Sequence, residues 1–331
     1  MTRLCVIPGD GIGQEVVPVA VRVLERLITD LQVVEAVAGW DCFQATGESV
    51  PASTLEAMRA CGAGLFGAVS SPAHAVPGYR SAIIQLRQTL GLGVNLRPVR
   101  SWPGLSVRSG INLLILRENS EGLYVGVERQ VSADLAVAER HISRQASEFL
   151  AHRAVEIARL RGARRITLVH KANILPLTCG LFRDCCREVL HQAGLDALVD
   201  ERLVDVAALQ LVEQPEAFDL LVTTNLFGDI LSDLASYWSG GLGLAPSLNW
   251  GQGIALAEPV HGSAPDIAGT GRANPLAAVL SSALLLRYHW RAETEANRLE
   301  SAVEGLLTDI SPGQLRQETT QGIEAELLAR L

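Results

Sequence analysis

Short apolar strands that alternate with helical segments are the feature that most constrains this chain. The sequence predicts strands at 3–8, 32–38 and 64–69, with helices at 13–27 and 51–61 between them. Strands alternating with helices are typical of folds in which helices cover a mostly parallel sheet. We therefore predict an α/β fold. The 331 residues leave room for two lobes.

A pair of aspartates follows another apolar run, at 218–224, which we also predict to be a strand. A helix beginning after Gly228 would place Asp229 and Asp233 at i and i+4 on one face, at the carboxyl end of that strand. Two carboxylates suit a hard cation such as Mg²⁺ or Mn²⁺. The alternative is that Asp229 caps the helix and Asp233 is a surface charge.

The rest of that helix favours the cation site. Its residues are apolar nearly all round, which predicts a buried helix, and a buried carboxylate needs a partner. The apolar positions are Ile230, Leu231, Leu234, Ala235, Tyr237 and Trp238.

Composition excludes several classes of protein. With 48% hydrophobic and 19% charged residues, the chain is expected to be a soluble globular protein. A net charge of −8 and the lack of a basic tract argue against nucleic acid and anionic membranes as partners. The first strand starts almost at Met1 and no apolar run could span a bilayer, so we expect a cytoplasmic protein. The six cysteines lack CxxC spacing and are expected to be reduced.

Lysine is almost absent from this sequence. Of 28 lysine and arginine residues, only Lys171 is a lysine, and it follows a predicted strand at 165–170. The main property of lysine that arginine lacks is that it can lose its proton. Lys171 is therefore a candidate for proton transfer, with a leftover surface lysine as the alternative.

The turn at 9–15 is rich in glycine. Its glycines are spaced G-x-G-x-G, and no acidic residue is expected at the end of the second strand, so we predict no Rossmann fingerprint. We interpret residues 9–15 as a tight turn between a strand and a helix, near a ligand.

Arginines recur at the ends of predicted elements. On a helix predicted over 80–91, one face carries Arg80, Ile83, Ile84 and Arg87. Arg97 and Arg117 lie at the ends of predicted strands at 94–97 and 111–116. Together, Arg87, Arg97 and Arg117 suit the clamping of a polycarboxylate.

Six ordered blocks carry a family resemblance. They are GDGIGQE at 9–15, LRQTLGLGVNLRP at 86–98, RENSEGLY at 117–124, HKAN at 170–173, NLFGDILSDLAS at 225–236 and EPVHGSAPDIAG at 258–269. The chain resembles the β-decarboxylating hydroxyacid dehydrogenases, the isocitrate and isopropylmalate dehydrogenase family, over essentially its whole length.

The resemblance implies a two-lobed α/β fold with a large mixed sheet, distinct from a Rossmann fold. Residues 1–99 with 250–331 would form the cofactor-binding lobe, which contains both termini. Residues 100–249 would form the metal-binding and dimerisation lobe. A homodimer with shared active sites, or a tetramer, is implied as well.

The resemblance also implies a chemistry: oxidative decarboxylation of a 3-substituted malate with NAD and Mg²⁺ or Mn²⁺. The catalytic residues would be Tyr124, Lys171 and Asp205, and the metal ligands Asp229 and Asp233 with Asp205 of the neighbouring subunit. From its position alone, Asp205 could equally be an N-cap. The predicted substrate-binding residues are Arg80, Ser81, Ile84, Arg87, Arg97, Arg117, Tyr124, Lys171 and Asn173.

The family's adenosine site resembles the loop at 261–267. An acid there, Asp266, can accept from ribose hydroxyls and repels a 2′-phosphate, which favours NAD over NADP. The implied cofactor-binding residues are Ile12, Asn173, His261, Gly262, Ser263, Ala264, Asp266, Ile267 and Asn274.

Within the family the fullest likeness is to homoisocitrate-specific members, which act in lysine biosynthesis through aminoadipate. It is carried by AGWDCFQATGESVP at 38–51 and SSPAHAVPGYRSAIIQLR at 70–87. Ile84 departs from the pattern, since some members have arginine there. Helix geometry instead places Arg80 two turns before Arg87, where it could meet a distal carboxylate. The alternatives are isopropylmalate, isocitrate, D-malate or tartrate as substrate, and an inactive regulatory subunit.

Overall fold

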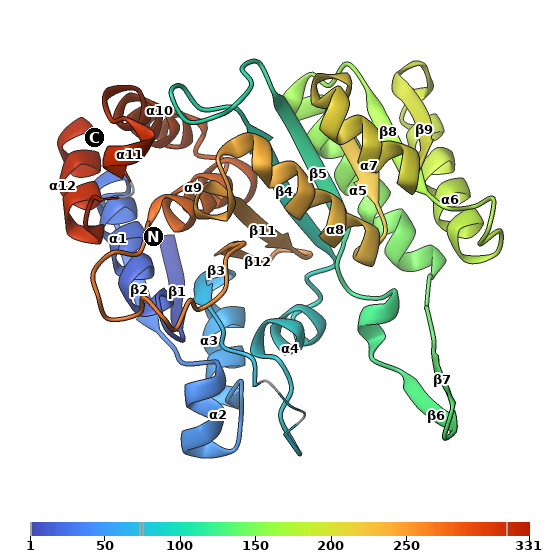
Figure 1. Ribbon diagram of the computed structural model, residues 1–331, viewed down its shortest axis with the longest axis horizontal. Coiled ribbons are helices and arrows are strands. Elements are labelled where there is room, and N and C mark those ends of the chain that lie inside the picture. Colours follow the sequence, from blue (N-terminus) through green and yellow to red (C-terminus); the bar gives the residue numbers. More distant parts are fainter. Residues whose placement is uncertain (1, 73, 75, 316) are drawn as a thin grey trace. The chain divides into compact units, whose positions relative to one another are not determined.

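The computed structural model describes residues 2–72, 74, 76–315 and 317–331, so Ala73 and Ala75 of the likeness at 70–87 lie outside the described residues. It is a mixed α/β protein whose main sheet has ten strands, which confirms the predicted fold class (Figure 1). The chain divides into two compact units. The first comprises Met1–Leu92, Ser101–Ser109 and Trp238–Leu331, and the second Gly93–Arg100 and Gly110–Tyr237.

The first unit holds five strands of the main sheet. In their order across the sheet they are β2 (Leu31–Glu35), β1 (Thr2–Gly9), β3 (Ala63–Ala68), β12 (Ala255–Pro259) and β11 (Pro246–Trp250). β1 is parallel to β2 and β3, β12 is parallel to β3, and β11 is antiparallel to β12. The three amino-terminal strands predicted from the sequence are thus present.

The helices of the first unit are α1 (Gly13–Leu27), α2 (Trp40–Thr46), α3 (Ala52–Cys61), α4 (Ala82–Thr89), α9 (Leu276–Leu284) with its π-helical extension η6 (Leu285–His289), α10 (Glu293–Asp309), α11 (Pro312–Leu315) and α12 (Thr320–Arg330). Among them, α1, α3 and α9 pack on these strands, and α10 and α12 pack on other helices. Helix α12 lies beside α1 (Figure 1). Met58, Phe66 and Leu86 belong to one buried core cluster that joins α3, β3 and α4.

Asp10 explains why α2 was not predicted from its own sequence. The Asp10 side chain is 1% exposed and accepts hydrogen bonds from the backbone N–H groups of Trp40 (2.8 Å), Asp41 (3.1 Å) and Ser70 (2.8 Å). The first N–H groups of a helix need such acceptors. A residue 30 positions away therefore caps α2 and ties the turn after β1 to the segment after β3.

We expect Asp10→Ala to destabilise the chain by about 3 kcal/mol, because it leaves buried N–H groups without an acceptor. Urea denaturation followed by circular dichroism measures the loss. Asp41→Asn, at an exposed position, is the matched control and should change stability little. An Asp10→Ala chain as stable as the wild type would show that water replaces the carboxylate.

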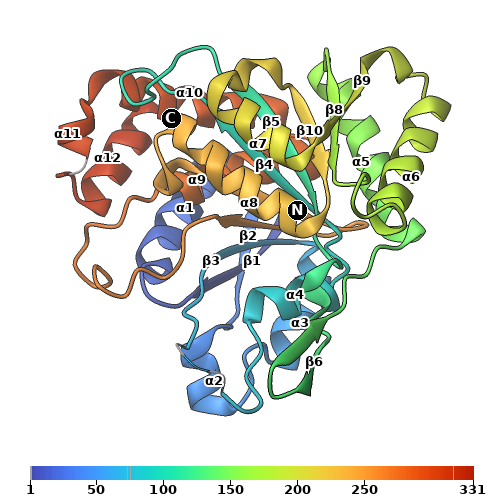
Figure 2. The same cartoon turned by 45° about the vertical axis from the view of Figure 1, so that its right-hand side comes forward.

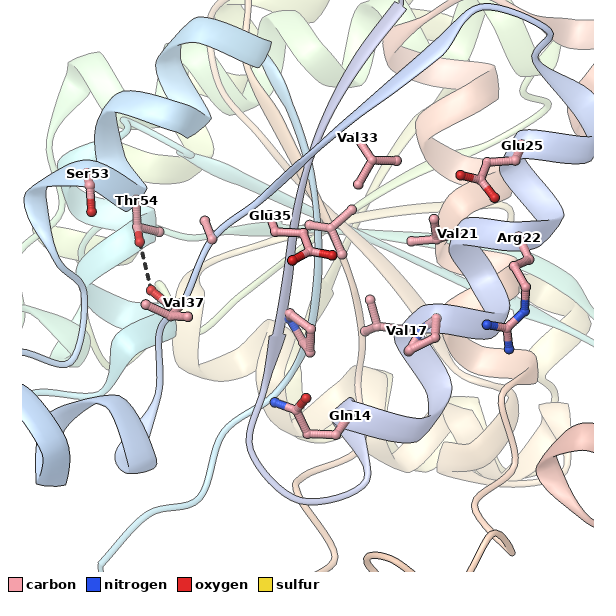
Figure 3. A pocket seen from close by; sticks show the side chains of 14 residues that line it. Gln14, Val17, Val21, Arg22, Glu25, Val33, Glu35, Val37, Ser53 and Thr54 are labelled. Carbon is pink, nitrogen blue, oxygen red and sulfur yellow. Dashed lines mark hydrogen bonds between the residues drawn. The ribbon is translucent and has the colours of Figure 1, made fainter.

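The expectation that no acidic residue ends the second strand was wrong, because β2 ends at Glu35. Glu35 and Gln14 line a cavity of about 860 Å³ between α1 and β2 (Figure 3). Val17 and Val21 of α1 line the same cavity. The glycine turn itself packs closely on the loop that contains Ser263. Gly11 has φ +55°, and a Cβ added to it would lie 2.2 Å from the carbonyl oxygen of Ser263.

The second unit holds the other five strands of the main sheet. Their order is β4 (Val94–Arg100), β5 (Asn112–Glu118), β10 (Leu220–Thr223), β8 (Ile166–His170) and β9 (Val199–Leu203). β4 and β5 are antiparallel, and the remaining neighbours are parallel. The carboxyl ends of β5, β10, β8 and β9 therefore share one edge, where candidate site residues follow each strand.

The other elements of the second unit are helices and one hairpin. The helices are α5 (Arg144–Arg161), α6 (Thr178–Gln192), α7 (Val204–Glu213) and α8 (Asn225–Ser236). The hairpin of β6 (Glu128–Ser132) and β7 (Leu135–Ala138) forms a separate two-stranded sheet and is largely exposed. None of the helices formed by the described residues has the length and apolar character needed to cross a membrane.

Candidate active site

Helix α8 begins one turn earlier than predicted, at Asn225, with Thr224 in the N-cap position. Asp229 therefore lies in the second turn and does not cap the helix. Asp229 and Asp233 still occupy i and i+4 positions on one face.

Arg117 lies across the first turn of α8. The side chain is 1% exposed, and a Cβ added to Gly228 would lie 2.7 Å from both its Cβ and its Cγ. Glycine at 228 therefore leaves the space that Arg117 fills. Arg117 donates through Nε (3.1 Å) and Nη2 (2.7 Å) to Oδ1 of Asn225, and through Nη1 to Oδ1 of Asp229. Asn225 thus aims the guanidinium at Asp229. Sequence reasoning missed this role, and only its place in the 225–236 block could have indicated it.

Arg97 joins the two aspartates. Its Nη1 donates to Oδ1 of Asp233 at 2.9 Å and to Oγ of Ser232 at 2.7 Å, and its Nη2 lies 3.5 Å from Oδ1 of Asp229. One guanidinium therefore spans both carboxylates, which places them within reach of a single cation.

Asp229 and Asp233 are partly open to solvent, with 33% and 54% of their side chains exposed. Burial nonetheless raises the pKa of Asp233, and the negative charge of Asp229 adds to this, against the opposing charge of Arg97. A divalent cation would favour the charged carboxylates. Two accessible oxygen ligands fit Mg²⁺ or Mn²⁺.

Tyr124 lies beside the aspartate pair, in the short 3₁₀ helix η1 (Leu123–Val125). Its hydroxyl donates to Oδ2 of Asp229 at 2.6 Å, and the Arg117 guanidinium lies 5.0 Å from the ring centroid. Burial raises the pKa of Tyr124, and the hydrogen bond to Asp229 raises it further. The hydroxyl is therefore held in its protonated form, as a proton donor must be.

Lys171 and Asp205 form a second pair. Lys171 follows β8, Asp205 lies in the first turn of α7, and Nζ is 2.5 Å from Oδ1. The hydrogen bond from Lys171 lowers the pKa of Asp205. Asn173, two residues further on, is exposed. The part of the chain that the structure describes contains no group of three or more His, Cys, Asp or Glu residues able to hold a metal ion.

In the first unit, the helix predicted over 80–91 is shorter than expected and the geometry assigned to Arg80 was wrong. Helix α4 starts at Ala82 with Ser81 in an extended N-cap conformation. The hydroxyl of Ser49 donates to the carbonyl oxygen of Arg80 at 2.6 Å, which holds Arg80 outside the helix. The exposed Arg80 guanidinium donates to Oε1 of Gln88 at 2.8 Å, so the side chain lies alongside α4 although the Arg80 backbone is outside the helix.

Arg87 is buried and ion-paired. Its Nη2 lies 2.5 Å from Oε1 of Glu258, which also accepts from Nδ2 of Asn249 at 2.8 Å. The Nε of Arg87 is buried and has no hydrogen-bond partner among the described residues. A buried donor of this kind fits a ligand carboxylate.

The predicted adenosine loop packs on the glycine turn of the same unit. The N–H of Ile12 donates to the carbonyl oxygen of Ser263 at 2.9 Å, and the hydroxyl of Ser70 donates to Oγ of Ser263 at 2.8 Å. Ala264 has a positive φ of 39°. The structure therefore brings Ile12 and Ser263 together, and the Ile12 N–H already donates its hydrogen bond to the loop.

The remaining loop residues differ in exposure. Gly262, Asp266 and Ile267 are exposed, whereas Oδ1 of Asn274 accepts from the N–H of Leu276 at the start of α9. Burial lowers the pKa of His261, and its Nε2 is buried without a partner among the residues described. An unpartnered ring nitrogen in the same loop as the exposed Asp266 fits the binding of a polar ligand.

Comparisons with known proteins agree on one family, whereas the names of the relatives differ in substrate. The family model for isocitrate/isopropylmalate dehydrogenase matches residues 3–324. The chain is 52% identical over 305 residues to an isocitrate/homoisocitrate dehydrogenase of Thermus thermophilus, covering 92% of this chain and 90% of that relative. It is 44% identical over 301 residues to a homoisocitrate dehydrogenase of Methanocaldococcus jannaschii, covering 87% and 85%. The solved isocitrate dehydrogenase of Methylococcus capsulatus matches with a TM-score of 0.93 and 39% identity, covering 100% of this chain and 99% of that one.

Proposed function

Because the chain belongs to the isocitrate/isopropylmalate dehydrogenase family, we propose that it oxidatively decarboxylates a 3-substituted malate with NAD and Mg²⁺ or Mn²⁺. We propose homoisocitrate, converted to 2-oxoadipate in lysine biosynthesis, as the preferred substrate. The observation that supports the proposed reaction is the pair of Asp229 and Asp233, which Arg97 spans and the Tyr124 hydroxyl contacts.

Asp229 and Asp233 would hold the metal ion together with the partner subunit's Asp205. When bound, the ion supplies positive charge that stabilises negative charge developing on the substrate oxygens. Arg97 and Arg117 already lie at these carboxylates and would bind the carboxylates of the substrate. Arg87, whose Nε is unpartnered among the described residues, would bind another.

Two proton transfers complete the proposed reaction. The partner subunit's Lys171, in its neutral amine form, would take the proton of the substrate hydroxyl as hydride passes to NAD. After CO₂ leaves, Tyr124 would donate its phenolic proton to the enolate carbon. The raised pKa of Tyr124 keeps that proton available until it is needed.

The proposed homodimer accounts for the exposed apolar residues of α7 and α8. These two helices lie side by side (Figure 2). Their exposed apolar residues are Val206, Leu209, Val212, Ile230 and Leu234, and the exposed Tyr237 directly follows α8. A patch of this kind marks an interaction surface. Because α7 carries Asp205 and α8 carries Asp229, a second copy docked here would bring its Asp205 towards the aspartate pair.

We expect the double substitution Leu209→Asp and Ile230→Asp to convert the dimer to a monomer and to abolish activity. Both side chains are more than half exposed, at 57% and 58%, so each chain should still fold. Light scattering after size exclusion measures the mass. Leu160→Asp on α5, at a site 56% exposed, is the matched control. A dimeric double variant, or an active monomer, would exclude this face as the shared interface.

Substrate preference is tested by the rate of NAD reduction with Mg²⁺ and a panel of acids. We expect the highest kcat/KM with homoisocitrate, ahead of isocitrate, 3-isopropylmalate, D-malate and tartrate. Arg80→Leu should lower kcat/KM for homoisocitrate roughly tenfold, since an exposed guanidinium binds a carboxylate weakly. The same variant should leave 3-isopropylmalate, which has no distal carboxylate, unaffected. Equal losses on both acids would assign Arg80 a structural role.

A further inference from the structure

His170 is the last residue of β8 and directly precedes Lys171. Its side chain is 4% exposed, and both ring nitrogens have partners. The N–H of Ala172 donates to Nδ1 at 3.1 Å, and Nε2 lies 3.1 Å from Oε2 of Glu201. Because Nδ1 accepts a hydrogen bond, the proton must be on Nε2, which donates to Glu201. The contacts therefore fix one tautomer of a buried histidine.

Glu201 is the hydrogen-bond acceptor that holds the His170 ring in place. It lies on β9, next to β8 in the sheet, and is also ion-paired with Arg187. Burial opposes its charge, but the hydrogen bonds from Arg187 and His170 hold the pKa of Glu201 below its ordinary value. It therefore stays a carboxylate and keeps its bond to His170.

Two links join the same pair of chain segments. Glu201 of β9 accepts from His170, and four residues later Asp205 pairs with Nζ of Lys171. The peptide group that joins Lys171 to Ala172 is also hydrogen-bonded at both its carbonyl oxygen and its N–H. Its carbonyl oxygen accepts from the N–H groups of Ile174 (3.0 Å) and Leu175 (2.9 Å), and the following N–H, of Ala172, is held by His170.

We propose that His170 is a positioning residue for Lys171, holding the backbone so that the lysine leaves the strand in one direction. The inference rests on the proposed function, in which Lys171 moves a proton. A merely structural histidine would stabilise the sheet without affecting the lysine side chain. The two roles differ in what happens to Lys171 when His170 is replaced.

The single lysine of this chain makes that difference measurable. When the protein is produced with ¹³C,¹⁵N-labelled lysine, its NMR spectrum reports on one side chain only, that of Lys171. His170→Phe removes both hydrogen bonds, and His170→Asn keeps an acceptor near the position of Nδ1. His191→Asn is the matched control, because His191 is exposed and pairs with Asp196 on the surface.

We expect His170→Phe to shift or broaden the Lys171 signals and to lower kcat by about 10- to 100-fold, with KM changed less than about threefold. His170→Asn should restore the Lys171 signals and most of kcat. Glu201→Gln serves as a second variant if His170→Phe fails to fold, and should cause a smaller loss of the same kind.

Unchanged Lys171 signals in folded His170→Phe would overturn the proposal, whatever happens to kcat. So would a loss of kcat that His170→Asn fails to relieve. A wild-type chain that oxidises none of the acids would contradict the proposed function instead, and the Lys171 signals would still decide whether His170 positions the lysine.

Discussion

Lys171→Arg is expected to lower kcat by roughly 10²- to 10⁴-fold while changing substrate affinity little. Arginine keeps the positive charge and can still pair with Asp205, which lies 2.5 Å from Nζ of Lys171. A guanidinium does not lose its proton in proteins, so it cannot take one from the substrate hydroxyl. Steady-state kinetics gives kcat, and calorimetry of substrate binding gives the affinity.

The control for this prediction exchanges arginine and lysine elsewhere. Arg183 on α6 pairs with Asp184 at the surface, and Arg183→Lys should leave kcat unchanged. A Lys171→Arg enzyme within about threefold of the wild-type kcat would assign Lys171 to charge alone, with proton transfer carried by another group.

Asp229→Asn is expected to raise the Mg²⁺ concentration needed for half-maximal activity by about 100-fold. The substitution removes a formal charge from the proposed cation site. It also replaces the acceptor of the Tyr124 hydroxyl and of Arg117, so kcat should fall as well. Activity titrated with Mg²⁺, and calorimetric titration of Mg²⁺ into the protein with substrate present, give the two effects separately.

Asp184→Asn is the control for the loss of a charge. Asp184 is exposed on α6 of the same unit, where it pairs with the neighbouring Arg183. It should leave the Mg²⁺ titration unchanged. If Asp229→Asn also left it unchanged, the aspartate pair would be a structural partner for Arg97 and Arg117 only.

Elements whose pattern is local could be predicted from the sequence. Strands β1, β3 and β8 are each centred on a short apolar run, and their positions followed from that pattern. Helix α2 and the start of α8 could not, since distant side chains determine them. Asp10 caps α2, and Arg117 packs on the first turn of α8 through Gly228.

The prediction that α8 is buried was wrong for a physical reason. Ile230 is 58% exposed and Leu234 37% exposed, although the helix is apolar nearly all round. Apolar residues indicate burial but do not tell burial within one chain from burial between two. The proposed dimer would cover this face.

The candidate site was partly predictable. The aspartate pair and the three arginines follow from spacing and from positions at element ends, and Lys171 from its rarity. Asn225 and Glu201 could not be found in this way, because their roles come from hydrogen bonds to residues more than 30 positions away. Arg80 was misplaced because the Ser49 hydroxyl, and not the local sequence, sets the start of α4.

The most direct test of the proposed reaction is the amount of NADH and CO₂ formed from homoisocitrate by the purified chain with Mg²⁺. We expect equal amounts of both products, and none when a chelator removes the metal. NADH without CO₂, or neither product from homoisocitrate, isocitrate or 3-isopropylmalate, would contradict oxidative decarboxylation as the activity of this chain.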